Sequence, residues 1–225
     1  MANTAVTPAE RATQVTGRGT KLDQAGPSRF IADPAGLGLA GFALSTMVLS
    51  VINVGLLPKT DMPVALGLAL AYGGAVQLLA GMWAFIKNDT FAAVALSSYG
   101  GFWISFYVLE QVLMPKIPAA DQGGALALYL ACWGFFSFYM WLASFRVSVA
   151  INAVFITLFP AYGLLAIGAA AGSNVLTNIG GGFGMATALA AWYASAAIVM
   201  NKTFRRDVLP VGELRSVQQD TATAV

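Results

Sequence analysis

The chain has 225 residues, of which 58% are hydrophobic and 10% are charged, and its formal net charge is +2. Soluble domains carry roughly 25% charged residues, so this composition excludes an ordinary soluble fold and indicates a protein of the lipid bilayer. With no histidine and a single cysteine, Cys132, the chain has no imidazole or thiolate metal site, no Ser/His/Asp or Cys/His catalysis and no intramolecular disulfide. We expect no cofactor. We also expect no nucleic-acid partner, because the basic residues are spread between the apolar stretches and at the two ends.

The N-terminal residues 1–33 are polar and lack the apolar core of a signal peptide, so we expect a disordered cytoplasmic tail. Asp33 is predicted to be the N-cap of the first helix, with Pro34 at the first helical position, where its missing amide hydrogen costs nothing. From there on, apolar stretches of about 20 to 25 residues, each long enough to cross a hydrocarbon core of ~30 Å, alternate with short polar breaks. The predicted spans cover residues 34–57, 62–86, 91–114, 122–145, 147–171 and 175–200.

The distribution of basic residues indicates the orientation of the spans. Six spans place the N-terminal tail, the second and fourth connections and the C-terminal tail on one side of the membrane, whereas Lys59 and Lys116 lie on the other side. The first side holds the remaining basic residues, which are Arg11, Arg18, Lys21, Arg29, Lys87, Arg146, Lys202, Arg205, Arg206 and Arg215. Because loops rich in Lys and Arg stay in the cytoplasm, we predict an all-α integral membrane protein with both termini in the cytoplasm. Its six-helix transmembrane domain covers residues 34–201, followed by a cytoplasmic tail over residues 202–225.

Glycine clusters lie inside several predicted spans. The cluster at residues 180–184 lacks the Lys and Ser/Thr of a nucleotide-binding loop and does not lie between a strand and a helix. Small residues allow helix backbones to approach closely in a membrane, so we expect these glycines to be sites of helix packing.

Polar side chains recur inside the predicted spans, where each is costly unless it faces the bundle interior or water. They are Ser45, Thr46, Asn53, Tyr72, Gln77, Ser97, Ser98, Tyr99, Glu110, Asn152, Thr157, Tyr162 and Asn178. Ser and Thr can bond to their own helix, but the amides of Asn53 and Gln77 are too large, so we expect both to line a polar path. No Lys or Arg lies deep in a span, and neutral donors without a fixed cation suit a small anion or a neutral solute. Glu110, near the outer end of the third span, fits three interpretations: a proton carrier, a vestibule charge, or a residue that reaches the membrane interface.

Several short motifs are distributed along the transmembrane region. Residues 33–39 read Asp-Pro-Ala-Gly-Leu-Gly-Leu. The further motifs are Gly41-Phe42, Asn53-Val54-Gly55, Tyr72-Gly73-Gly74 with Gln77, Asn88 through Phe91, Ser98-Tyr99-Gly100 with Phe102-Trp103, Leu164 through Gly168, and Leu209-Pro210-Val211-Gly212-Glu213. In order and spacing, over about residues 33–213, the chain resembles the acetate uptake transporter family. The signature of that family reads Asn-Pro-Ala-Pro-Leu-Gly-Leu.

This resemblance implies a six-helix protomer with one pore, assembly as a homohexamer in the inner (plasma) membrane, and passage of acetate and sometimes succinate. It also implies a narrow apolar constriction, which the motif positions assign to Phe42, Tyr99 and Leu158 on the first, third and fifth spans. The side chains that we expect along the substrate path are Asn53, Tyr72, Gln77, Ser98, Thr46 and Trp103. Two positions depart from the signature, because Asp33 replaces its Asn and Gly36 replaces its second Pro. The Asp33 carboxylate would lie at the inner mouth of the pore, where its negative charge would repel an anion.

The residues leave the mechanism open between a channel-like and a proton-coupled route. A carboxylate that enters against an inside-negative potential loses about 2.3 kcal/mol per elementary charge per 100 mV. Concentrative uptake therefore needs a co-transported proton or consumption of the acid inside, and Glu110 is the candidate proton-linked residue.

Three other classes of function are alternatives to carboxylate transport. An ammonia or neutral-solute channel would also use a narrow apolar pore. A structural or sensory membrane protein without transport activity is a further alternative, but it gives no reason for polar groups to recur in several spans. An intramembrane enzyme would need a catalytic dyad at membrane depth, and the sequence offers no histidine, no paired carboxylates and no buried Lys beside a Ser.

The predicted topology can be tested by labelling single cysteines from outside the cell. A cysteine placed after Thr60, after Ala120 or near Ser173 is expected to react with a membrane-impermeant reagent, because these positions lie in outer connections. Cysteines in either tail should be protected in intact cells. External labelling of Arg215→Cys would contradict the six-span arrangement.

Overall fold

The structure, a computed structural model, describes residues 31–214. In this part of the chain six helical segments are long and apolar enough to cross a membrane, which confirms the predicted all-α fold of six spans. The spans are α2 (Ala35–Val54); α3 (Met62–Leu68) with η3 (Ala69–Val76) and α4 (Gln77–Ile86); α5 (Thr90–Val108) with η4 (Leu109–Leu113) and η5 (Met114–Lys116); α6 (Ala119–Ser144); α7 (Val149–Ala171); and α8 (Asn174–Phe204). A short 3-10 turn, η2 (Lys59–Asp61), precedes α3. Most of the predicted tail over residues 1–33, and residues 215–225 of the predicted C-terminal tail, lie outside the described residues.

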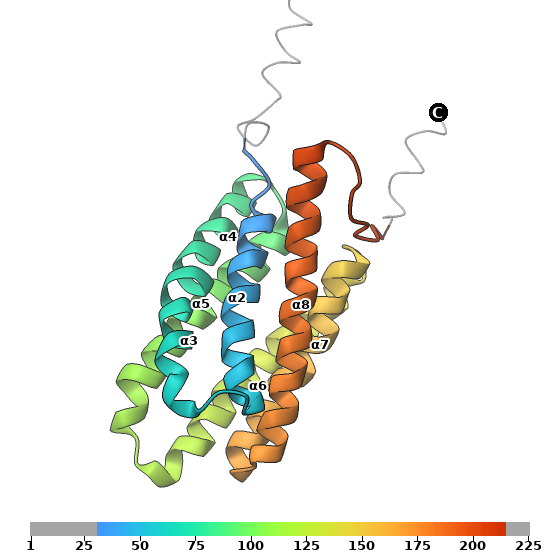
Figure 1. Ribbon diagram of the computed structural model, residues 1–225. Helices are drawn as coiled ribbons and strands as arrows, with labels where there is room; N and C mark the ends of the chain where they lie inside the picture. The colour runs from blue at the N-terminus through green and yellow to red at the C-terminus, as the bar shows by residue number, and fades with distance from the viewer. Residues whose placement is uncertain (1–30, 215–225) are drawn as a thin grey trace, which may run out of the picture.

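Neighbouring spans run in opposite directions, and Figure 1 shows the start of α2 and the end of α8 at the same end of the bundle. α2 packs along α8, α8 along α7, and α7 along α6. α4 and α5 pack on each other and on the opposite side of α2 from α8. The first span is therefore central, and α6 lies at the periphery.

The ends of α2 follow local sequence signals, with one difference from the prediction. The helix begins at Ala35, and Pro34 takes the cap position with φ −76° and ψ −16°. The Asp33 carboxylate accepts the Ala35 amide at 3.0 Å. The helix therefore starts one residue later than predicted, because the first backbone hydrogen bond of the helix runs from the Gly38 amide to the Pro34 carbonyl oxygen at 3.0 Å, whereas the predicted bond from an orphan amide to the Asp33 carboxylate is present. At the other end, Gly55 terminates α2 with φ 88°, which glycine adopts without a steric penalty.

The second span contains an irregularity that the sequence did not predict. Its middle section, η3, is a π-helical stretch of 8 residues, and such wide turns are rare outside functional regions of helices. The stretch includes Tyr72, and it ends immediately before Gln77. A Cβ added at Gly41 on α2 would lie 2.7 Å from the Tyr72 carbonyl oxygen, so the wide turn packs directly against α2.

Residues 208–214, here called the C-terminal strap, fold back from α8 against the start of α7. The carbonyl oxygens of Gly212 and Val211 accept the backbone amides of Val149 and Ala150 at 2.9 and 3.1 Å. Amides in the first turn of a helix have no partner within that helix. The strap therefore caps the N-terminus of α7.

Side chains of α8 fix the strap in place. The Asn201 side-chain oxygen accepts the Val208 and Leu209 amides at 2.8 and 2.9 Å, and its amide nitrogen donates to the Leu209 carbonyl oxygen at 2.9 Å. The Tyr193 hydroxyl donates to the Pro210 carbonyl oxygen at 2.7 Å. The motif at residues 209–213 is thus anchored to the bundle at both α7 and α8.

α2 and α8 approach closely at Gly181. A Cβ added at Gly181 would lie 2.7 Å from the Val54 backbone nitrogen, whereas a Cβ added at the adjacent Gly182 would meet nothing within 4 Å. The predicted packing role of the glycine cluster is confirmed at Gly181. Gly182 does not share it within the protomer.

Replacing Gly181 by alanine is expected to lower the free energy of unfolding by about 1–3 kcal/mol, because the added methyl overpacks a helix contact. Gly182→Ala is the matched control, since it adds the same methyl to the same helix in open space. Thermal unfolding of the purified protein in detergent measures both variants. Equal unfolding midpoints for the two variants would contradict the close contact.

Candidate functional site

Two cavities lie end to end inside the bundle. The first, here called the outer cavity, has a volume of about 550 Å³ and opens near the connection between α2 and α3. The second, the inner cavity, has a volume of about 500 Å³ and opens near the starts of α2, α5 and α7. Phe42 and Leu158 line both cavities, so these two side chains separate them.

Three side chains from three helices form the boundary between the cavities, here called the neck. Phe42 on α2, Tyr99 on α5 and Leu158 on α7 are 3%, 3% and 4% exposed. The Phe42 and Tyr99 ring centroids lie 5.3 Å apart, and Tyr99 lines the inner cavity. The structure thus brings together the three residues that the motif positions assign to a constriction. Their role in permeation stays a prediction.

The hydroxyl of Tyr99 is bonded within the bundle. Its oxygen lies 2.8 Å from the Ser137 hydroxyl oxygen on α6. The Ser137 hydroxyl itself donates to the Trp133 carbonyl oxygen at 2.8 Å, which uses the only hydrogen of that hydroxyl. Tyr99 is therefore the donor to Ser137, and its contribution to the neck is the aromatic ring.

Each neck residue is followed, four positions later, by a side chain with a polar hydrogen. These side chains, here called the donor ring, are Thr46, Trp103 and Tyr162. Residues four positions apart lie on the same face of a helix, about 6 Å apart along its axis. The three helices run in the same direction, so all three donors lie on the outer side of the neck, and all three line the outer cavity.

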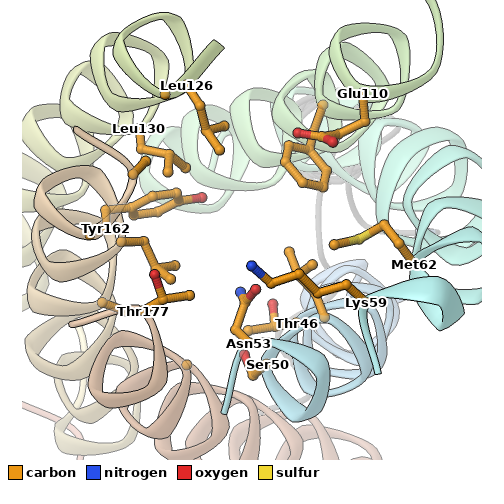
Figure 2. A pocket seen from close by; sticks show the side chains of 18 of the residues that line it. Thr46, Ser50, Asn53, Lys59, Met62, Glu110, Leu126, Leu130, Tyr162 and Thr177 are labelled. Carbon is orange, nitrogen blue, oxygen red and sulfur yellow. The ribbon is translucent and has the colours of Figure 1, made fainter. Parts of the chain in front are cut away.

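The donor ring has hydrogen-bonding capacity that the protein does not use. Thr46 Oγ1 and Trp103 Nε1 are buried and have no hydrogen-bond partner in residues 31–214. Figure 2 shows the Tyr162 hydroxyl directed toward the centre of the outer cavity. A buried donor without a partner costs about 1–3 kcal/mol. Because Thr46 Oγ1 and Trp103 Nε1 are shielded from the cavity space, a ligand that accepts hydrogen bonds meets the Tyr162 hydroxyl first and reaches the other two groups only after their side chains move.

The other residues predicted along the substrate path lie at different depths. Gln77 is 1% exposed and lines the inner cavity, and its Oε1 has no partner among the described residues. Asn53 lines the outer cavity, where Figure 2 shows it beside Ser50. Tyr72 and Ser98 are half-buried and line neither of the two cavities. Their predicted place along the path stays untested.

Sequence reasoning did not assign Tyr162 to the path, although it counted the residue among the polar groups of the spans. The spacing along α7 was the signal that could have found it. Tyr162 follows Leu158 by four residues, as Thr46 follows Phe42 on α2.

Charged side chains lie at both mouths. Lys59 and Glu110 line the outer cavity. The charged residues that line the inner cavity are Asp33, Asp89, Arg146 and Glu213. Asp33 and Asp89 accept backbone amides of the first turns of α2 and α5, at 3.0 and 2.9 Å. The positive ends of these helices offset part of the repulsion that a carboxylate at the inner mouth exerts on an anion.

The C-terminal strap contributes to the inner mouth. Val211, Glu213 and Leu214 line the inner cavity, together with residues 146–148 that precede α7. The hydrogen bonds between the strap and α7 therefore also determine the shape of this opening.

The chain is similar to known proteins over most of its length. Residues 19–215 match the model of the GPR1/FUN34/yaaH family. The succinate-acetate/proton symporter SatP of Escherichia coli K12 is 36% identical over 185 residues, which cover 81% of this chain and 96% of that protein. The ammonia transport outward protein 2 of Saccharomyces cerevisiae is 38% identical over 176 residues, which cover 76% of this chain and 62% of that protein. A solved structure of the bacterial acetate channel SatP matches with a TM-score of 0.75 at 34% identity, covering 81% of this chain and 99% of that one.

Proposed function

The chain belongs to the GPR1/FUN34/yaaH family, and on this premise we propose that it transports small carboxylates, acetate and also succinate, through one pore in each protomer. The observation that carries this proposal is the donor ring immediately outside the apolar neck. Thr46, Trp103 and Tyr162 offer O–H and N–H groups to a carboxylate without a fixed positive charge. Neutral donors replace part of the hydration of an anion without trapping it, which permits passage.

The neck then selects by dehydration and size. Phe42, Tyr99 and Leu158 present aromatic and aliphatic groups that cannot replace lost water, so each crossing anion pays for desolvation there. A small carboxylate sheds less water in a short neck than a larger one. Beyond the neck, Gln77 offers an amide in the inner cavity.

We favour a channel-like route over proton coupling. A coupling carboxylate must reach both sides of the barrier in turn, and Glu110 lines the outer cavity but not the inner one. Glu110 remains the candidate for a proton-linked step. In a channel-like route the concentration gradient of the acid supplies the driving force, against an electrical cost of about 2.3 kcal/mol per charge per 100 mV.

The proposed assembly is a homohexamer in the inner membrane, with both termini in the cytoplasm. Only 17% of the span formed by α6 is buried within the protomer, against 39–56% for the other spans, so α6 offers the largest free apolar face for neighbouring protomers or lipid. Large apolar side chains such as Leu128 and Phe135 cover this face, with 69% and 70% exposed. In the proposed division, residues 34–201 form the transport domain between a cytoplasmic tail at residues 1–33 and one at residues 202–225.

An ammonia channel is the second candidate. The similarity to the yeast ammonia transport outward protein 2 favours it, as does the apolar neck, which a neutral molecule crosses at little cost. Ammonia has a single lone pair and accepts one hydrogen bond at a time, whereas the two oxygens of a carboxylate accept several, so a set of donors suits a carboxylate better. We therefore rank carboxylate transport first.

Uptake of labelled acetate into proteoliposomes, with and without competing ammonium, tests the proposed function. The parent protein is expected to take up acetate, and Tyr162→Phe to lower the rate about tenfold, because hydrogen bonds to charged groups contribute about 1.5–3 kcal/mol. Tyr139→Phe is the matched control, since it removes a hydroxyl from a side chain of the peripheral helix α6 that is 43% exposed. Acetate uptake at the background of empty liposomes, together with rapid ammonium uptake, would favour the ammonia channel.

The neck is tested by Leu158→Ala, which is expected to raise acetate flux and to admit larger dicarboxylates, because it widens the barrier without removing a donor. Tyr99→Phe keeps the ring and removes only the hydroxyl that donates to Ser137, so its flux should stay near that of the parent. Leu189→Ala, at a side chain of α8 that is 58% exposed, controls for the loss of a leucine. If Leu158→Ala assembles normally and keeps the rate and size selectivity of the parent, Leu158 is ordinary helix packing.

A further inference from the structure

The outer cavity has one basic residue at its opening. Lys59 and Glu110 are the charged side chains that line this cavity among the described residues. Figure 2 shows the Lys59 side chain extending across the opening toward Asn53, with Glu110 on the far side of Met62. The ammonium group thus lies over the entrance of the path that leads to the donor ring.

The backbone around Lys59 determines this position. Pro58 has an extended conformation, with φ −68° and ψ 153°, and its carbonyl oxygen accepts the Asp61 amide at 3.0 Å. This hydrogen bond closes the short turn η2 that carries Lys59. Only three residues, Leu56, Leu57 and Pro58, separate the turn from the glycine that ends α2, so a short loop presents the lysine at the rim.

The other basic residue on this side of the membrane provides an internal comparison. Lys116 lies at the end of the third span, and it lines neither cavity. The two lysines carry the same charge on the same side of the bundle. They differ in whether that charge faces the pore.

We propose that Lys59 collects anions at the outer mouth and that it favours dicarboxylates over monocarboxylates, an inference that rests on the proposed function. The Lys59 ammonium raises the local concentration of carboxylates at the entrance. It is exposed and hydrated, so it attracts an anion without holding it. The donor ring and the neck then act on an anion that is already concentrated above them.

The charge of the substrate determines how strongly Lys59 raises its local concentration at the outer mouth. A unit charge about 6–7 Å from an anion in water changes the local concentration of that anion by about threefold. A dianion responds with the square of that factor, about ninefold. The attraction acts over about 10 Å at 0.1 M salt and is largely screened at 1 M.

The test compares Lys59→Gln with Lys116→Gln in proteoliposomes, with acetate and succinate supplied to the outer side at neutral pH. At low ionic strength Lys59→Gln is expected to raise the apparent KM about threefold for acetate and about ninefold for succinate, with an unchanged maximal rate. At 1 M salt the difference from the parent should disappear. Lys116→Gln should match the parent throughout, and Lys59→Arg should restore the parent values.

Two results would overturn the inference while the proposed function stands. One is the same KM for both glutamine variants at low salt. The other is a loss of rate in Lys59→Gln that persists at 1 M salt and affects both substrates equally, which would indicate a role in packing. A parent protein that takes up neither carboxylate would remove the proposed function and this inference together.

Discussion

Inside the hydrocarbon layer every backbone polar group must find a hydrogen-bond partner within the protein. This requirement determines the fold of the molecule. Helices satisfy that requirement within each segment, so six of them account for nearly all of the described chain. The same requirement acts on side chains, which are driven toward the interior when they are polar. The two cavities and the polar groups that line them therefore arise from the same constraint as the fold.

The helical repeat accounts for the relation between the neck and the donor ring. Because α2, α5 and α7 run in the same direction, a step of four residues moves outward on all three helices at once. One turn presents Phe42, Tyr99 and Leu158, and the next presents hydroxyl and indole groups. An apolar barrier and a set of donors are thus stacked along one axis by regular turns of three helices, while the π-helical stretch of the second span packs beside them at Gly41.

Much of this arrangement could be predicted from the sequence, and the failures have physical causes. The six spans follow from the length of the apolar stretches, and the structure brings together the three neck residues that the motif positions singled out, whose role in permeation stays a prediction. The π-helical stretch in the second span could not be foreseen, because it depends on contact with α2 at Gly41. The bond between Tyr99 and Ser137 joins residues of two helices, and no local pattern indicates it. Asp33 was assigned to the cap because it is a strong capping residue, whereas Pro34 decides where the helix begins.

The C-terminal strap links the formation of the inner mouth to synthesis of the chain. Residues 208–214 follow all six spans, yet they supply the carbonyl groups that accept the first amides of α7. While the ribosome is still producing α8, those amides have no partner, and the inner opening lacks Val211, Glu213 and Leu214. The inner opening therefore gains its complete rim only after the residues that follow α8 have been made.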